Sequence, residues 1–101
     1  MITYQNGITK KSLSFVFDNL HRLGEINSIA HKRNKSQIFY ETTINGTDDI
    51  MIIKGGLGSG YGGEGPNGLH KLLVELGLSE ELANEYVYEN TDTEYSFEVE
   101  F

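Results

Sequence analysis

Cysteine is absent from this chain of 101 residues. Its absence excludes disulfide bonds, a thiolate metal site and a cysteine nucleophile. No apolar run approaches the ~18 residues of a membrane span. Residues 1–6 have neither the basic region nor the apolar stretch of a signal peptide. These absences fit a reducing compartment, and we expect a cytoplasmic protein with no membrane association.

Basic residues are scarce, and the shortage is uneven along the chain. Eight Lys and Arg stand against 15 Asp and Glu, which gives a net charge of −7. Residues 1–40 hold six basic and two acidic side chains (+4), whereas residues 41–101 hold two basic and thirteen acidic ones (−11). This asymmetry indicates either a charged partner or a basic first half that packs against the acidic second half. The acidic half also disfavours direct binding of nucleic acid.

The length allows a single domain over residues 1–101, and apolar periodicity predicts its elements. A first helix is predicted between Thr9 or Ser12, which can cap its start, and Gly24, which can end it. Its apolar stripe comprises Leu13, Val16, Phe17, Leu20 and Leu23. Two more helices are predicted after residue 68, over 69–76 and from Ser79 to about Tyr88.

The remaining periodic segments predict strands. They cover residues 2–4, 26–31, 37–44, 47–54 and 94–101, the first being the weakest. Asn45-Gly46 is typical of a hairpin turn, and Ile50, Ile52 or Ile53 would point inward from the return strand according to its register. The order (β)αβββααβ predicts an α+β fold, with a mostly antiparallel sheet of about four strands and three helices on one face.

Residues 55–68 form the most unusual segment, because they hold eight of the twelve glycines and the only proline. Glycine lets the backbone reach positive φ and approach a ligand closely, at an entropic cost. Gly62, Gly63, Gly65 and Gly68 would let several N–H groups point at an anion near the start of the following helix. That helix could be capped by Asn67 or by the backbone at Gly65, with Pro66 at its first position. The alternative is a structural or interface loop without a ligand.

The standard nucleotide motifs are not met by this loop. Residues 58–63 fit a loose G-x-G-x-x-G pattern, but the predicted hairpin before them is not the parallel βαβ unit that a Rossmann site requires. The Walker sequence G-x-x-x-x-G-K-[ST] is absent. A phosphate site would therefore depend on the loop backbone and on side chains near it.

Four kinds of side chain would complete such a site. Tyr61 would stack on a base or ring, or fold back as an anchor. Glu64 would accept from a hydroxyl or amine, or occupy the helix N-terminus itself. Lys54 and Lys71 flank the loop in sequence, and Arg33, in the basic segment 31–36, could approach it in space.

Catalytic and metal sites are not predicted. The three histidines lack ligand spacing such as H-x-x-x-H. A Ser59–His70 hydrolase lacks an identifiable third group, and a Glu64–His70 acid–base pair is the remaining alternative. We expect neither a metal nor a cofactor, and the sequence favours a non-enzyme over an enzyme.

We therefore expect a small binding module that holds a phosphate-bearing small molecule, such as a nucleotide or cyclic nucleotide, for sequestration or sensing. Its predicted ligand-binding residues are Lys54, Gly60, Tyr61, Gly62, Gly63, Glu64, Gly65, Asn67, Gly68, Lys71 and Arg33. A homo-oligomer is expected, since a short exposed loop needs a second chain to bury a ligand. The alternative is an acidic inhibitor or immunity-type protein that blocks a basic enzyme or a nucleic-acid-binding protein through its surface. That surface would include Glu85, Glu89, Glu94, Glu98 and Glu100.

Overall fold

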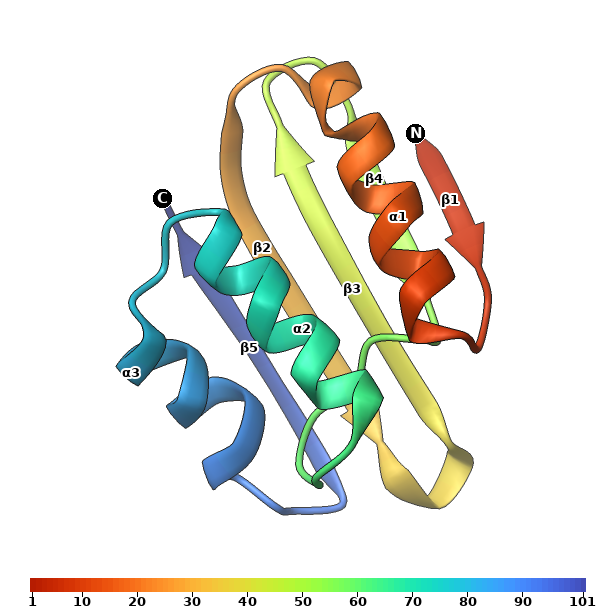
Figure 1. The fold of residues 1–101 in the computed structure, drawn as a ribbon, viewed down its shortest axis with the longest axis vertical. Coiled ribbons are helices and arrows are strands. Elements are labelled where there is room, and N and C mark those ends of the chain that lie inside the picture. Colours follow the sequence, from red (N-terminus) through yellow and green to blue (C-terminus); the bar gives the residue numbers. More distant parts are fainter.

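Five strands form one mixed sheet in the computed structural model, which describes residues 1–101, and the helices all lie against one face of it (Figure 1). The spatial order is β1-β4-β3-β2-β5. The strands are β1 (Ile2–Gln5), β2 (Ile26–Asn34), β3 (Phe39–Gly46), β4 (Ile50–Lys54) and β5 (Glu94–Glu100). The α+β class and the element order are confirmed. The estimate of about four strands was one short, and the sheet is mixed because β1 runs parallel to β4.

Three α-helices cover the sheet, and short irregular turns extend two of them. They are α1 (Thr9–Asn19), continued by the 3-10 turn η1 (Leu20–Leu23), α2 (Glu64–Glu75), and α3 (Glu80–Asn84), continued by the π-helical turn η3 (Glu85–Glu89). A further 3-10 turn, η2 (Lys35–Gln37), joins β2 to β3. The predicted start of α3 is confirmed, because the Ser79 side chain accepts a hydrogen bond from the N–H of Leu82. Gly24 ends η1 with a φ of 72°.

The core lies between the helices and the inner face of the sheet. β4 contributes Met51 and Ile53, which settles its register and leaves Ile52 on the other face. β5 alternates as its sequence predicts, with Phe97 and Val99 inward and acidic side chains outward. The helices contribute Val16, Leu69, Leu72, Leu73 and Val87. Burial of this apolar stripe against the sheet holds the two layers together.

The hairpin predicted at Asn45-Gly46 is confirmed, because β3 and β4 pair antiparallel, but its turn lies slightly later than predicted. Both residues belong to β3, and the turn that follows is closed by the Gly46 N–H, which donates to the carbonyl of Asp49. Gly46 serves a different purpose, since a Cβ placed there would lie 2.1 Å from the carbonyl oxygen of Leu23. The glycine allows η1 to approach the sheet edge-on.

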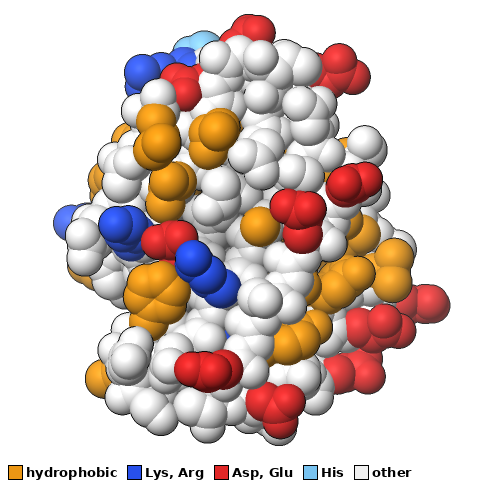
Figure 2. Space-filling view, turned by 180° about the vertical axis from the view of Figure 1, so that it is seen from behind, with side chains coloured by type: hydrophobic (Ala, Val, Ile, Leu, Met, Phe, Trp, Pro, Cys, Tyr) orange, Lys and Arg blue, Asp and Glu red, His pale blue; other side chains and the backbone are white.

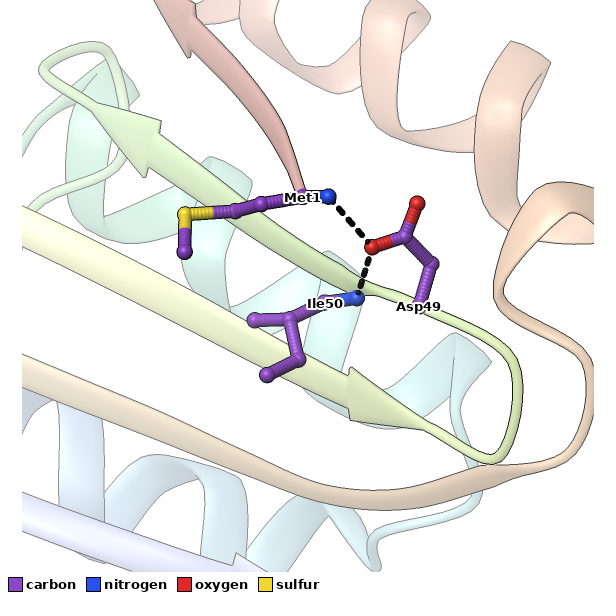
Figure 3. A network of polar contacts seen from close by, with 3 residues as sticks. All are labelled: Met1, Asp49 and Ile50. Carbon is purple, nitrogen blue, oxygen red and sulfur yellow. Dashed lines mark hydrogen bonds and ion pairs between the residues drawn. The ribbon is translucent and has the colours of Figure 1, made fainter.

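The first strand is fastened beside β4 at its N-terminal end (Figure 3). The ammonium group of Met1 lies 2.8 Å from Oδ1 of Asp49, which also accepts a hydrogen bond from the N–H of Ile50. Both contacts favour the ionised carboxylate, so the pKa of Asp49 lies below its usual range.

No helix covers the opposite face of the sheet (Figure 1). Lys32 of β2 and Glu41 of β3 form an ion pair at 3.7 Å on this face. Acidic side chains gather toward the side where β5 and α3 lie (Figure 2). None of the helices combines the length and apolarity needed to cross a bilayer.

Candidate functional site

The glycine-rich segment consists of a buried first part and an exposed second part. Residues 57–60 are buried, whereas residues 61–64 are exposed. The helix α2 then begins at Glu64, with Gly63 as its N-cap at a φ of 148°. The predicted caps are therefore wrong, since Gly65 and Asn67 lie inside the first turn. Pro66 is tolerated at the third position because the first four N–H groups of a helix have no internal acceptor.

The buried part is anchored by a polar network around Ser59. Its hydroxyl lies 2.9 Å from Nε2 of His31, whose Nδ1 lies 2.9 Å from the hydroxyl of Thr42. Arg33 donates to the same Ser59 oxygen from its Nη1 at 3.1 Å. The predicted partner of Ser59, His70, makes no hydrogen bond to it, and its own Nε2 is buried without a partner beside Tyr88. A Ser–His pair does exist, but both side chains are closed off from solvent.

The network holds His31 in its neutral form. The side chain is 1% exposed, and burial together with the neighbouring charge of Arg33 lowers its pKa to about 3. In the neutral ring one nitrogen donates and the other accepts, which matches the two hydroxyl partners.

Arg33 is a structural clamp rather than a ligand contact. It is 3% exposed and donates to the carbonyls of Asn90 and Asp92 as well as to Ser59, while its guanidinium lies 4.9 Å from the ring centre of Tyr95. No carboxylate pairs with it, and burial lowers its pKa. This placement does not support the predicted ligand contact of Arg33, because each of its three side-chain nitrogens donates to a protein acceptor.

Gly60 belongs to the same clamp. A Cβ at Gly60, whose φ is 80°, would lie 2.6 Å from Cζ of Arg33, and the Gly60 N–H donates to the carbonyl of Val87. The Lys35 ammonium bonds the carbonyls of Gly60 and Thr91. Gly60 is therefore a packing glycine that fastens the loop to the segment before β5, and this placement does not support its predicted ligand contact either.

Tyr61 is folded back over the loop, although its side chain remains 43% exposed. Its hydroxyl would lie within 2.7 Å of a Cβ at Gly58 or Gly65, so these two glycines make room for the ring. The ring meets that of Tyr40 edge-on at 5.9 Å. Burial, with a smaller contribution from Tyr40, raises the pKa of Tyr61, which keeps the phenol protonated.

An aromatic pocket of about 240 Å³ lies beside this ring. Its walls are Gly7, Thr9, Tyr40, Gly56, Leu57, Gly58, Tyr61, Glu64 and Gly65. An interhelical groove of about 300 Å³ lies between the first turns of α1 and α2, lined by Thr9, Lys10, Leu13, Glu64, Asn67, Gly68 and Lys71. Thr9 and Glu64 line both, so the two hollows adjoin. Each lies near the lower end of the ~300–1,000 Å³ range of small-molecule sites.

Two helix N-termini meet at this place (Figure 1). Neither α1 nor α2 has a side-chain cap, and the first turn of α1 carries no acidic residue. The helices touch here, since a Cβ at Gly68 would lie 2.4 Å from Cγ2 of Thr9. Lys10 and Lys71 add positive charge to the groove. The combination of two positive dipole ends and two ammonium groups favours an anion.

The loop backbone adds free donors. Within residues 55–63 only the N–H groups of Gly55 and Gly60 donate to protein acceptors, which are the carbonyls of Tyr40 and Val87. The side chain of Glu64 makes neither a hydrogen bond nor an ion pair, so it does not cap α2, although its negative charge lies in the first turn of that helix. Asn67 is partly engaged, because its Oδ1 accepts from the Tyr88 hydroxyl.

The structure brings together one part of the predicted set. Tyr61, Glu64, Gly65, Asn67, Gly68 and Lys71 line the two hollows. Gly62 and Gly63 are exposed beside them without lining either, and Lys54 lies on the uncovered sheet face. Thr9, Lys10, Tyr40 and Gly58 were missed. Only Lys10 carried a signal, as a basic residue where a helix start usually favours acids.

The comparisons with known proteins leave this geometry as the sole guide to function. No protein-family model, curated protein or solved structure matches the chain.

Proposed function

We propose that this protein binds a phosphate-bearing small molecule, of the nucleotide or cyclic-nucleotide class, in the aromatic pocket and the interhelical groove. The observation that carries the proposal is the meeting of two uncapped helix N-termini beside Lys10 and Lys71. Such an arrangement supplies several charge-assisted hydrogen bonds to one anion.

The phosphate, base and sugar of such a ligand would each contact a different part of the two hollows. The phosphate lies in the interhelical groove between the two lysines. The base lies in the aromatic pocket, against Tyr61 and Tyr40 and the glycine backbone. The Glu64 carboxylate lies between the hollows, where it would repel a phosphate but accept hydrogen bonds from ribose hydroxyls. This division of roles predicts a ligand with both a sugar and a phosphate.

Binding without turnover fits these walls better than catalysis. The Ser59–His31 pair is sealed inside the protein, and Glu64 is the only carboxylate that lines either hollow. The proposal is therefore sequestration or sensing of the ligand in the cytoplasm. Both hollows are open to solvent on one side, so a second copy of the chain would complete the enclosure of the ligand.

Charge reversal in the groove tests the proposal. Lys71→Glu and Lys10→Glu should weaken binding of AMP, ATP or cyclic AMP by at least about tenfold, because each removes a charge-assisted hydrogen bond worth about 1.5–3 kcal/mol. Calorimetric titration measures the affinity. Lys11→Glu is the matched control, since Lys11 lies on the same first turn but outside the groove.

Two further measurements define the ligand. Glu64→Gln should weaken a nucleotide that uses its ribose there, yet strengthen inorganic phosphate by removing a repulsive charge. Native mass spectrometry of protein purified from its host should show a bound mass that contains phosphorus. If none of these compounds binds, or if Lys11→Glu weakens binding as much as Lys71→Glu, the groove is not the site.

A further inference from the structure

The strand β5 forms an open edge of the sheet (Figure 1). The N–H of Phe101 donates to the carbonyl of Asn27, and the N–H of Lys35 donates to that of Thr93. Because bonded and non-bonded pairs alternate along an antiparallel ladder, odd-numbered residues of β5 bond to β2. The even-numbered residues direct their N–H and C=O groups outward. These residues are Glu94, Ser96, Glu98 and Glu100.

The same residues carry the charge of this edge. Their side chains stand on the uncovered sheet face, and three of the four are acidic. Residues 79–101 as a whole hold eight acidic side chains and no basic one. Neither ion pair of the protein involves any of them. The only polar contact of an edge carboxylate is that of Glu94, which accepts from Asn34.

We propose that an extended, basic segment of a partner protein adds to β5 as an antiparallel sixth strand, with Lys or Arg at every second position. Backbone groups of the segment would satisfy the outward groups of β5. Its basic side chains would lie opposite the acidic ones, and each such cross-strand pair is favourable. This interaction is separate from ligand binding in the interhelical groove.

Charge excludes a second copy of this chain as the occupant. Two β5 strands paired across a two-fold axis would place glutamates opposite or diagonal to glutamates, and like charges in these positions are destabilising. The acidic edge thus discourages self-pairing while it favours a basic strand.

The surface beside β5 has room for long side chains. A hollow of about 490 Å³ lies on the uncovered face, and the small residues Ala30, Thr43 and Ser96 line it. Glu98 also lines it, as do Lys32 and Glu41, which form an ion pair. A Lys or Arg side chain from the added strand can cross Ser96 and reach the Glu98 carboxylate.

The probe for this interaction is the synthetic peptide acetyl-KVKTKVK-amide, added to the isotope-labelled protein and followed by amide NMR. We expect saturable shifts at the outward amides of β5, together with slower hydrogen exchange there. The same peptide, with the backbone nitrogen of each lysine methylated, keeps every charge but lacks the backbone N–H donors that face β5. It should not bind. Added salt should weaken the unmodified peptide.

Variants of the protein separate strand addition from diffuse attraction. Glu98→Lys should weaken the peptide by roughly fivefold or more, whereas Glu81→Lys, the same charge change on α3, should have little effect. Ser96→Pro removes one outward N–H without touching the ladder to β2, so the fold should persist while peptide binding is lost. A circular dichroism spectrum checks that fold.

Several results would overturn the proposal. Equal binding of the N-methylated peptide, or equal losses from Glu81→Lys and Glu98→Lys, would mean that charge alone attracts the peptide. Absence of saturable binding would remove the site. Concentration-dependent dimerisation that Ser96→Pro abolishes would assign the edge to a second copy of the chain instead.

Discussion

Acidification should destabilise this protein through a single buried histidine. His31 is neutral in the folded chain because burial and Arg33 lower its pKa to about 3, while in the unfolded chain it has an ordinary pKa of about 6.5. At about pH 5, His31 therefore binds a proton in the unfolded state but not in the folded state. The stability that His31 contributes is complete above about pH 6.5 and is lost as the pH falls toward 3.

The size of the effect follows from these two pKa values. Between pH 7.5 and pH 4.5 the free energy of unfolding should fall by about 2.6 kcal/mol on account of His31 alone. A loss of this size is a large share of the ~5–15 kcal/mol that stabilises a typical domain. Carboxylates also titrate at this pH, so the histidine has to be isolated by comparison with a variant.

The comparison is His31→Gln, unfolded by urea at pH 7.5 and at pH 4.5 and followed by far-ultraviolet circular dichroism. The glutamine keeps a polar group near Ser59 but takes up no proton. The variant should be less stable at pH 7.5, yet lose about 2.6 kcal/mol less than the parent on acidification. His21→Gln is the matched control and should follow the parent, because the His21 side chain is exposed on η1.

If His31→Gln and the parent lost equal stability between the two pH values, the folded chain would accept the proton on His31, and the buried network would not hold the ring neutral. A histidine ring signal that titrates near pH 6 and belongs to His31 would lead to the same conclusion.

Two further predictions concern the backbone. Gly60→Ala should lower the free energy of unfolding in urea by more than about 1 kcal/mol, because its φ of 80° disfavours a side chain and the new Cβ would meet Arg33. The control is Gly62→Ala, whose Cβ meets no atom within 4 Å and which should be neutral or stabilising by up to about 1 kcal/mol. Equal effects of the two substitutions would show that the clamp is absent. Ile38, at the β2–β3 tip, is 84% exposed and has a φ of 51°. A left-handed β-branched residue is strained by about 1–2 kcal/mol, so Ile38→Asn should raise the thermal midpoint, and a fall would mean that the isoleucine packs in solution.

The sequence predicts those parts of the fold that depend on local periodicity. The start of α3 at Ser79 and the alternation of β5 follow from neighbours a few residues apart. Most of the α1 stripe follows in the same way, but Phe17 is exposed, and Phe15 packs against the core instead. The pairing of β1 does not, because four residues carry too little pattern to identify β4 as a parallel partner. The parallel pairing of β1 with β4 is the only reason that the sheet is mixed.

The candidate site is predictable only where it is local to the glycine segment. Tyr61, Glu64 and Lys71 follow one another closely, whereas Thr9 and Tyr40 reach the site from α1 and β3. Arg33 shows the limit most clearly. In the sequence it belongs to a basic turn, and its burial follows from acceptors that lie 26 to 59 residues further along the chain.

The glycines of the loop could not be assigned separate purposes from composition. Gly58 and Gly65 make room for Tyr61, Gly60 makes room for Arg33, and Gly68 lets α2 touch α1. Each purpose depends on a neighbour that only the tertiary structure supplies. Eight glycines in one segment therefore resemble a ligand loop even where they are packing residues.

The clamp of Arg33 and Lys35 also has a consequence for the order of events during synthesis. These two side chains, from β2 and from the turn η2, fasten the loop at Ser59 and Gly60 to carbonyls of residues 90–92, which are synthesised well after the loop. The sheet order requires β5 to pair with β2 at the same time. A nascent chain that has completed β1 to β4 and α2 would still hold its glycine loop unfastened. The loop is then fastened only after residues 90–92 have been synthesised, so the proposed ligand would meet a finished site only late in folding.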